Sequence, residues 1–301
     1  MRISPSDPAA SSPRRSEAPV IPGLIPAAAP TARVRATAPG LGEAQRTLPE
    51  ETPVALVYNG GTQAVMMATP ADIEDFALGF SISEGIVDRD RLPAVEVIAH
   101  DTPTGPAIEA QMWVSAETEA ALMARRRANV GPVGCGLCGI DSLTQALRTL
   151  PVLPEAHVGL TVADVKFALG ELRDWQPLHD ETRAVHAAGF WQPGQGILLA
   201  REDVGRHNAL DKLIGALARA GIDPAMGAIA LTSRLSVEMI QKTVMAGCPI
   251  LLAVSAPTAR AVRIAEEANL TLASISRGDV QVFSHPRRIL LRRREGSRFG
   301  R

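Results

Sequence analysis

The chain has 301 residues, of which 46% are hydrophobic, and 31 cationic and 32 anionic side chains leave a net charge of −1. This length suits two domains, each large enough to bury a core. The balanced charge excludes a global field that would attract nucleic acid or an anionic membrane. Three cysteines in a chain of this length exclude a disulfide framework.

The compartment follows from what the chain lacks. The first twenty residues have no apolar core of the kind found in signal peptides. No uninterrupted apolar run reaches the roughly 18 residues that a membrane-spanning helix needs. We therefore expect a cytoplasmic protein in a reducing environment.

Composition also suggests the domain organisation. Residues 1–45 are rich in Pro, Ala, Ser and Arg, and such a segment buries too little apolar surface to offset its ordering entropy. We expect a disordered tail there and an arginine-rich tail over residues 291–301. Between them, an N-terminal α/β domain is expected over residues 46–150 and a second α/β domain over residues 151–290.

The N-terminal domain is expected to open with a β-hairpin. Strands are predicted at residues 54–58 and 65–68, joined by Asn59-Gly60-Gly61, which tolerates positive φ. Thr69 then suits the N-cap of a helix, with Pro70 at its first position, and Gly85 suits its end. Further strands are predicted at residues 95–98 and 112–114, and a further helix at residues 117–127.

The second domain shows strands that alternate with helices, which predicts an α/β layered sheet. The strands are expected at residues 197–200, 228–232, 249–254, 270–275 and 280–283. The helices are expected at residues 206–220, 236–246 and 257–268.

Polar loops follow these strands and lead into helix N-termini, which favour anions. Right-handed crossovers would bring the loops to one edge of the sheet. Arg206, His207, Arg234 and Arg277 would then meet at a rim that suits a phosphate-bearing ligand. The alternative is that capping residues such as Ser236 and Thr258 simply accumulate before helices.

Residues 131–141 hold a pair of cysteines, Cys135 and Cys138, among four glycines and a proline. This composition predicts a flexible, exposed loop, and the arginines at 125–127 would lower the pKa of a nearby thiol. We expect this pair to be reactive and to carry sulfur. Cys248 precedes an apolar strand and is expected to be buried and inert.

A single CxxC pair is compatible with redox exchange, with half of a zinc site, or with sulfur relay. No strand-to-helix context of the thioredoxin type surrounds it. Zinc would need two further ligands, for which His186 and His207 are the candidates. The zinc deaminase signature is incomplete, because Ala187 and Ala188 follow His186 where a catalytic glutamate is required.

Several motifs together resemble the formate dehydrogenase accessory sulfurtransferases, the FdhD/NarQ family, over roughly residues 48–290. They are Asn59-Gly60, Thr69-Pro70-x-Asp72, Gly79-Phe80-x-x-x-Glu84-Gly85, Cys135-Gly-Leu-Cys138-Gly139, the block from Asp203 to Lys212, Ser233-Arg234-x-Ser236-x-Glu238-Met239, Ala256-Pro257-Thr258 and Ile275-x-Arg277-Gly278. The chain departs from the family at Arg183 and Ala184, where glycines are usual, and at Ile275, where phenylalanine is common.

The resemblance implies a sulfur carrier that accepts a persulfide from a cysteine desulfurase. The carrier would pass sulfur to the bis-molybdopterin guanine dinucleotide form of the molybdenum cofactor for formate dehydrogenase. It implies Cys135 as the persulfide residue and Cys138 as its partner.

The same resemblance implies that the second domain is cytidine deaminase-like and that the protein is a homodimer without a tightly bound metal of its own. Its cofactor loop would fall on Ile275, Ser276, Arg277, Gly278, Asp279 and Val280, beside Arg206 and His207. The alternatives are a non-catalytic chaperone that binds the cofactor and formate dehydrogenase, and a zinc-dependent nucleotide hydrolase.

Overall fold

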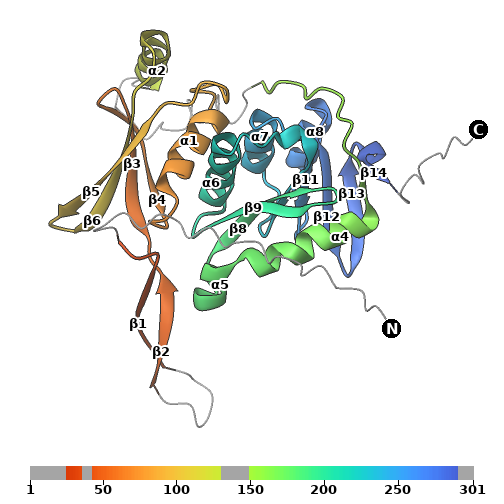
Figure 1. Ribbon diagram of the computed structural model, residues 1–301, viewed down its shortest axis with the longest axis horizontal. Coiled ribbons are helices and arrows are strands. Elements are labelled where there is room, and N and C mark those ends of the chain that lie inside the picture. The colour runs from red at the N-terminus through yellow and green to blue at the C-terminus, as the bar shows by residue number, and fades with distance from the viewer. Residues whose placement is uncertain (1–24, 36–42, 130–148, 291–301) are drawn as a thin grey trace, which may run out of the picture.

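The structure is a computed structural model that describes residues 25–35, 43–129 and 149–290 (Figure 1). Within these ranges it contains a four-stranded sheet, a six-stranded sheet and two short two-stranded pairings. The expected α/β class is confirmed. No helix among the described residues combines the length and apolar character needed to cross a bilayer.

The four-stranded sheet has the order β4-β3-β6-β5. Its hairpin turns at Asn59 and Gly60, which both have positive φ, as the sequence predicts. One face is buried, because alternate side chains such as Leu56 and Ile108 pack into a core with Phe76. Its strands are β3 (Thr52–Tyr58), β4 (Gly61–Ala68), β5 (Val95–Thr102) and β6 (Gly105–Met112).

Two predictions about this part of the chain are wrong. The strand expected at residues 112–114 lies earlier, because Val114 bonds through its backbone to the side chain of Asn59 and leaves the sheet. Helix α1 (Ile73–Ser83) begins after Asp72 and not at Thr69. Thr69 is fully buried, and its polar groups are bonded to Asp203 and Val204 instead of to the helix.

The six-stranded sheet has the order β13-β12-β11-β10-β8-β9. Strands β9, β10, β11 and β12 run in one direction, whereas β8 and β13 run in the other. Its strands are β8 (His186–Gln192), β9 (Gly196–Asp203), β10 (Ala228–Leu231), β11 (Ile250–Ala253), β12 (Thr271–Ser276) and β13 (Asp279–Ser284).

Helices cover both faces of this sheet, which makes a three-layer arrangement (Figure 1). The expected helices lie on one face as α6 (Arg206–Arg219), α7 (Val237–Met245) and α8 (Ala259–Glu267). Helix α4 (Val162–Glu171) covers the other face and was not predicted. Its N-terminus is closed by a reciprocal capping pair between Thr161 and Asp164.

Several short elements complete the described chain. The remaining helices are α2 (Ala116–Asn129), which confirms the helix expected at 117–127, α5 (Pro177–Thr182) and three single turns, η1 (Leu172–Trp175), η2 (Pro224–Met226) and η3 (Pro286–Arg288). A two-stranded pairing joins β7 (Leu160–Thr161) to β14 (Ile289–Leu290).

The expectation of a disordered segment over residues 1–45 is wrong for its end. Strands β1 (Ala28–Arg35) and β2 (Glu43–Pro49) form an antiparallel hairpin that projects away from β3 (Figure 1). The Arg46 guanidinium donates to the carbonyl oxygen of Thr182 at 3.2 Å, so β2 is anchored on α5. Residues 1–24 and 291–301 lie outside the described residues.

Helix α1 lies between the two sheets and crosses α6 at very close range (Figure 1). Two glycines face each other at the crossing. A Cβ added to Gly79 would overlap the carbonyl oxygen of Asp211, and one added to Gly215 would overlap that of Asp75. Only glycine permits this approach of two helix backbones.

Buried ion pairs surround the crossing. Lys242 of α7 donates to both carboxylate oxygens of Asp211 at 2.9 Å and to the hydroxyl of Ser83 at 3.0 Å. Asp75 of α1 accepts from Arg201 at 2.7 Å and from Arg219 at 2.8 Å. The two carboxylates and Lys242 are removed from water, so each of them needs its partner, whereas Arg219 stays partly exposed.

We predict that Gly79→Ala lowers the free energy of unfolding by about 3 kcal/mol or more, because the added methyl forces α1 away from α6. Gly170→Ala is the matched control, since Gly170 lies in helix α4 with open space around its Cα. The control should gain about 0.5–1 kcal/mol from helix propensity. Urea unfolding measures both values, and equal stabilities would contradict the close packing.

Candidate functional site

One edge of the six-stranded sheet gathers the polar loops. Strands β9, β10, β11 and β12 all end at this edge, and β8 and β13 begin there. The sequence-based expectation that these loops share an edge is therefore confirmed. We call this edge the rim, defined by Arg206, His207, Arg234, Thr258 and Arg277.

The rim is elongated. Its loops follow the strand order, so Arg206 and His207 lie at one end and Arg277 lies at the other. Four interstrand steps separate β9 from β12, which corresponds to about 19 Å. The rim side chains therefore do not converge on one phosphate, and the arrangement suits a long ligand with several anionic groups.

Arg206 and His207 occupy the first turn of α6. The N-cap, Gly205, offers no side chain to the free N–H groups of that turn. The strand expected at residues 197–200 is longer than predicted, because β9 continues to Asp203. Asp203 is fully buried and directs its carboxylate at the loop, where it accepts from the N–H of Gly205 at 2.8 Å.

His207 lies beside the N-terminus of α7. Its Nε2 is 3.9 Å from a carboxylate oxygen of Glu238, and Glu238 accepts from the Ser236 hydroxyl at 2.8 Å. Burial and the neighbouring Arg206 lower the pKa of His207 below its ordinary value. Burial opposes ionisation of Glu238, but the bond from Ser236 and the nearby cations leave its pKa lowered.

His186 begins β8 and pairs in register with Asp203. Burial, followed by Arg206, lowers its pKa. The sequence considered His186 only as a zinc ligand, whereas the structure places it at the rim between β9 and β10. Among the described residues, no group of three His, Cys, Asp or Glu side chains is placed to hold a metal ion.

The loops after β10 and β11 lie side by side in the middle of the rim. Leu235 and Pro257 form an isolated bridge, and the N–H of Thr258 donates to Leu235 at 3.1 Å. Thr258 caps α8 by accepting from Ala261, so the helix expected at 257 begins two residues later. Arg234 is exposed.

The predicted cofactor loop is a tight β-turn. Arg277 and Gly278 both have positive φ, and Ser276 pairs with Asp279 on either side of them. These residues are exposed. Ile275 and Val280 pair as neighbours in the sheet and pack against the core under α4. Ile275 therefore serves packing, and Arg277 is the charged group that the turn presents.

The departure at Arg183 keeps the backbone shape that glycine would favour. Arg183 ends α5 with φ of 58°, in the left-handed region. Its side chain is exposed and lies 3.4 Å from Asp180. The conformation at this position is thus retained by a residue that adopts it at a cost in backbone strain.

The three cysteines divide into two groups. Cys135 and Cys138 lie outside the described residues, so their roles stay predictions. Cys248 is fully buried, and burial raises the pKa of its thiol to about 12. The expectation of a buried Cys248 is confirmed.

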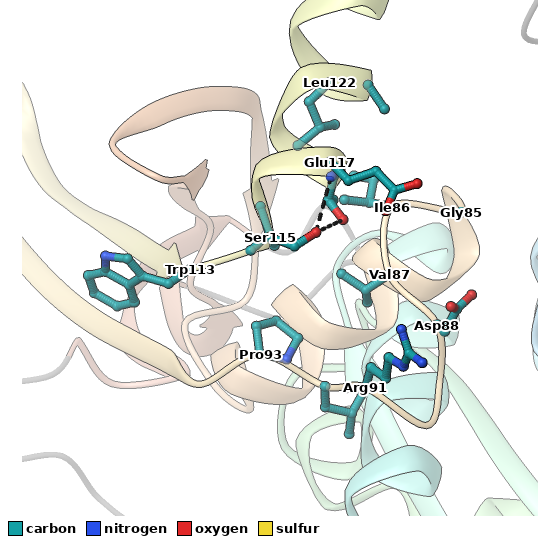
Figure 2. Close-up of a pocket in the computed structure, with 14 residues that line it drawn as sticks. Gly85, Ile86, Val87, Asp88, Arg91, Pro93, Trp113, Ser115, Glu117 and Leu122 are labelled. Atoms are coloured by element: carbon teal, nitrogen blue, oxygen red, sulfur yellow. Dashed lines mark hydrogen bonds between the residues drawn. The ribbon is translucent and has the colours of Figure 1, made fainter.

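A separate cavity lies against the four-stranded sheet, outside the rim. It has a volume of about 660 Å³ and lies between the segment after α1, the end of β6 and the start of α2 (Figure 2). Ile86 and Leu122 form part of its apolar lining, and Asp88, Arg91 and Glu117 supply charges. None of the predicted site residues within the described ranges lines this cavity.

Sequence reasoning missed how the rim is supported. It left Asp203 between the strand expected at residues 197–200 and the helix expected at residues 206–220, although its carboxylate is buried and bonded to Lys212 at 2.6 Å. Asp203 and Asn208 are five residues apart in the sequence, and Asn208 and Lys212 are four apart. Only the second spacing places two residues on the same face of a helix. The signal available was the presence of two of the chain's three lysines, Lys212 and Lys242, within apolar helix faces.

Comparison with known proteins gives a consistent result. Residues 49–290 match the FdhD/NarQ family. The chain is 50% identical over 260 residues to the sulfur carrier protein FdhD of Agrobacterium fabrum, which covers 86% of this chain and 94% of that protein. It is 51% identical over 253 residues to the sulfur carrier protein FdhD of Brucella abortus, with coverage of 83% and 93%.

A solved structure has the same fold. It is a protein provisionally described as a formate dehydrogenase accessory protein, from Desulfotalea psychrophila. The TM-score is 0.65 at 25% sequence identity, and the match covers 88% of this chain and the whole of that one.

The lowered histidine pKa values predict an acid-sensitive fold. Below about pH 6.5 the unfolded chain binds protons at His186 and His207 that the folded chain does not yet bind. Stability should therefore fall with acid, by at most about 1.4 kcal/mol per pH unit for each histidine. Urea unfolding at pH 7 and pH 5.5 measures this effect. Between these two pH values, the double variant His186→Gln/His207→Gln should lose less of its free energy of unfolding than the parent chain, and an equal loss would contradict the prediction.

Proposed function

The chain belongs to the FdhD/NarQ family, and from this premise we propose that it carries sulfur for formate dehydrogenase. The relatives at about 50% identity are named sulfur carrier proteins. The sulfur would arrive as a persulfide from a cysteine desulfurase. It would leave for the bis-molybdopterin guanine dinucleotide cofactor, which is here the acceptor of sulfur and not a resident group.

The observation that carries the acceptor assignment is the shape of the rim. Cationic groups recur along one edge of the sheet, with Arg206 at one end and Arg277 about 19 Å away. Two of the helices that start there, α6 and α7, have no side-chain cap on their free N–H groups. Phosphates bind both kinds of group. An extended dinucleotide cofactor has phosphates far enough apart to use both ends of the rim.

We assign the sulfur chemistry to Cys135 and Cys138. The Cys135 thiolate would attack the outer sulfur of the donor persulfide, which breaks the donor's S–S bond and leaves a persulfide on Cys135. Attack by the Cys138 thiolate on the inner sulfur would then release hydrosulfide and leave a Cys135–Cys138 disulfide. A thiol reductant would restore the pair for the next cycle.

A cofactor chaperone without catalysis is the second candidate. It would use the same rim and the same client, the catalytic subunit of formate dehydrogenase, but neither cysteine. The two functions differ only in whether sulfur is carried, so the thiols decide between them. A homodimer is compatible with either function.

We predict that Cys135→Ala abolishes persulfide loading and activation of formate dehydrogenase while leaving the fold intact. Cys138→Ala should load but transfer poorly, because it lacks the second thiol. Cys248→Ala is the matched control and should load normally, since its thiol is buried. Mass spectrometry after incubation with a cysteine desulfurase and cysteine measures loading.

Two results would change this assignment. Loading on Cys138 alone would exchange the roles of the two thiols. Full activation of formate dehydrogenase by the double variant Cys135→Ala/Cys138→Ala would leave the chaperone as the function.

We also predict that Arg206→Ala and Arg277→Ala each weaken the binding of GDP at their own end of the rim by about 1.5–3 kcal/mol, the value of a charge-assisted bond. Arg287→Ala is the control, because Arg287 follows β13 at the opposite edge of the same sheet and pairs with Glu155. Titration calorimetry gives the three affinities. Unchanged affinity in both rim variants would place the nucleotide elsewhere.

A further inference from the structure

The carboxylate of Asp203 accepts hydrogen bonds from four donors at the point where β9 leads into α6. One oxygen accepts from Lys212 at 2.6 Å and from the N–H of Thr69 at 2.9 Å. The other accepts from the N–H of Gly205 at 2.8 Å and from the amide of Asn208 at 3.0 Å. Asp203 and Lys212 are both fully buried, so this pair is shielded from water.

The bonds to Asp203 enclose the two rim residues at the start of α6. Gly205 lies immediately before Arg206, and Asn208 lies immediately after His207. Both neighbours are held by the same carboxylate oxygen. Gly205 has little room to shift, because a Cβ there would lie 2.9 Å from the Asn208 amide.

We propose that Asp203, neutralised by Lys212, is a positioning residue that sets the direction of Arg206 and His207 toward the anionic ligand of the rim. This inference rests on the proposed function. It assigns Asp203 no contact with the ligand. Its contribution is to present the first turn of α6, with its free N–H groups, the Arg206 guanidinium and the His207 imidazole, in one orientation.

The same group ties this orientation to the four-stranded sheet. Thr69 lies directly after β4. Its carbonyl oxygen accepts a hydrogen bond from the Lys212 ammonium at 2.9 Å, and its hydroxyl accepts one from the N–H of Val204 at 3.1 Å. The Asn208 amide also donates to the carbonyl oxygen of Met67 at 2.8 Å. The end of β4 thereby braces the loop that carries Arg206, although it contributes no rim residue.

The chain offers a matched control in a second buried pair. Asp211 lies on the same helix as Lys212, is also fully buried, and is bonded by Lys242 at 2.9 Å. It also accepts from the hydroxyl of Ser83 of α1 at 2.7 Å. Asp211 thus has the same chemistry as Asp203 but holds none of the rim loop.

The test compares Asp203→Asn with Asp211→Asn for GDP affinity by calorimetry and for thermal midpoint. Both should lower the midpoint, because each leaves a buried lysine without its carboxylate. Asp203→Asn should also weaken GDP binding roughly fivefold or more, whereas Asp211→Asn should stay within about twofold. A purely structural Asp203 would give equal affinities in the two variants and would overturn the proposal.

A double-mutant cycle checks the route of the effect. If Asp203 acts in part through Arg206, then Asp203→Asn should cost less GDP affinity in the Arg206→Ala background than in the parent chain. Additive losses would overturn the positioning role. Thr69→Ala serves where Asp203→Asn does not fold, because it removes only the acceptor for Val204, and it should weaken GDP binding about twofold or more.

The two proposals fail differently. In the first case, the parent chain binds GDP and Arg206→Ala does not, but Asp203→Asn and Thr69→Ala bind it as well as the parent chain. This result would overturn only the role of Asp203. A wild-type chain that does not bind GDP would overturn the nucleotide rim and this inference with it.

Discussion

The contact between the backbones of α1 and α6 is the constraint on which the rest of this structure depends. It exists because Gly79 and Gly215 have no side chains to separate the helices. Helix α1 packs its other side on the four-stranded sheet, and α6 packs on the six-stranded sheet. The crossing therefore fixes one sheet relative to the other. Because the two helix backbones are so close, polar groups of both helices lie in a space without water. These groups form the buried ion pairs around the crossing.

These ion pairs give the region geometric precision more than stability. Removing a lysine and a carboxylate from water costs several kcal/mol for each ion, and their attraction offsets this only when every donor is satisfied. Lys212 is bonded to Asp203 and Thr69, and Lys242 is bonded to Asp211, Glu84 and Ser83. A buried charge has few positions in which all its partners are in reach. The loop at the start of α6 is held by two such bonds, from Gly205 and from Asn208 to Asp203.

The ten residues from Asp203 to Lys212 include both buried residues that hold the fold together and residues of the rim. Asp203, Asn208, Asp211 and Lys212 point inward and hold the helices and sheets together. Arg206 and His207 lie at the rim, where the functional proposal needs them. The rim itself spans the width of the sheet, so its two ends are supported differently. Buried bonds that cross to β4 support the loop of Arg206, whereas Arg277 lies in the turn of the β12–β13 hairpin.

The sequence alone determined the α/β class, most helices and strands, the shared edge of the polar loops and the family. These follow from local periodicity, glycine stops and motif spacing, which are properties of short segments. It placed the start of α1 at Thr69 and missed α4 and the β1–β2 hairpin. Those outcomes depend on partners distant in the chain, such as Asp203, which bonds Thr69 across 134 positions. Only the tertiary structure decided that Asp203 and Lys212 are buried partners and that the rim is about 19 Å long. The first outcome depends on a counterion that is brought close by folding, because a buried charge needs a partner. The second depends on the order of the strands in the sheet, which local sequence patterns do not determine.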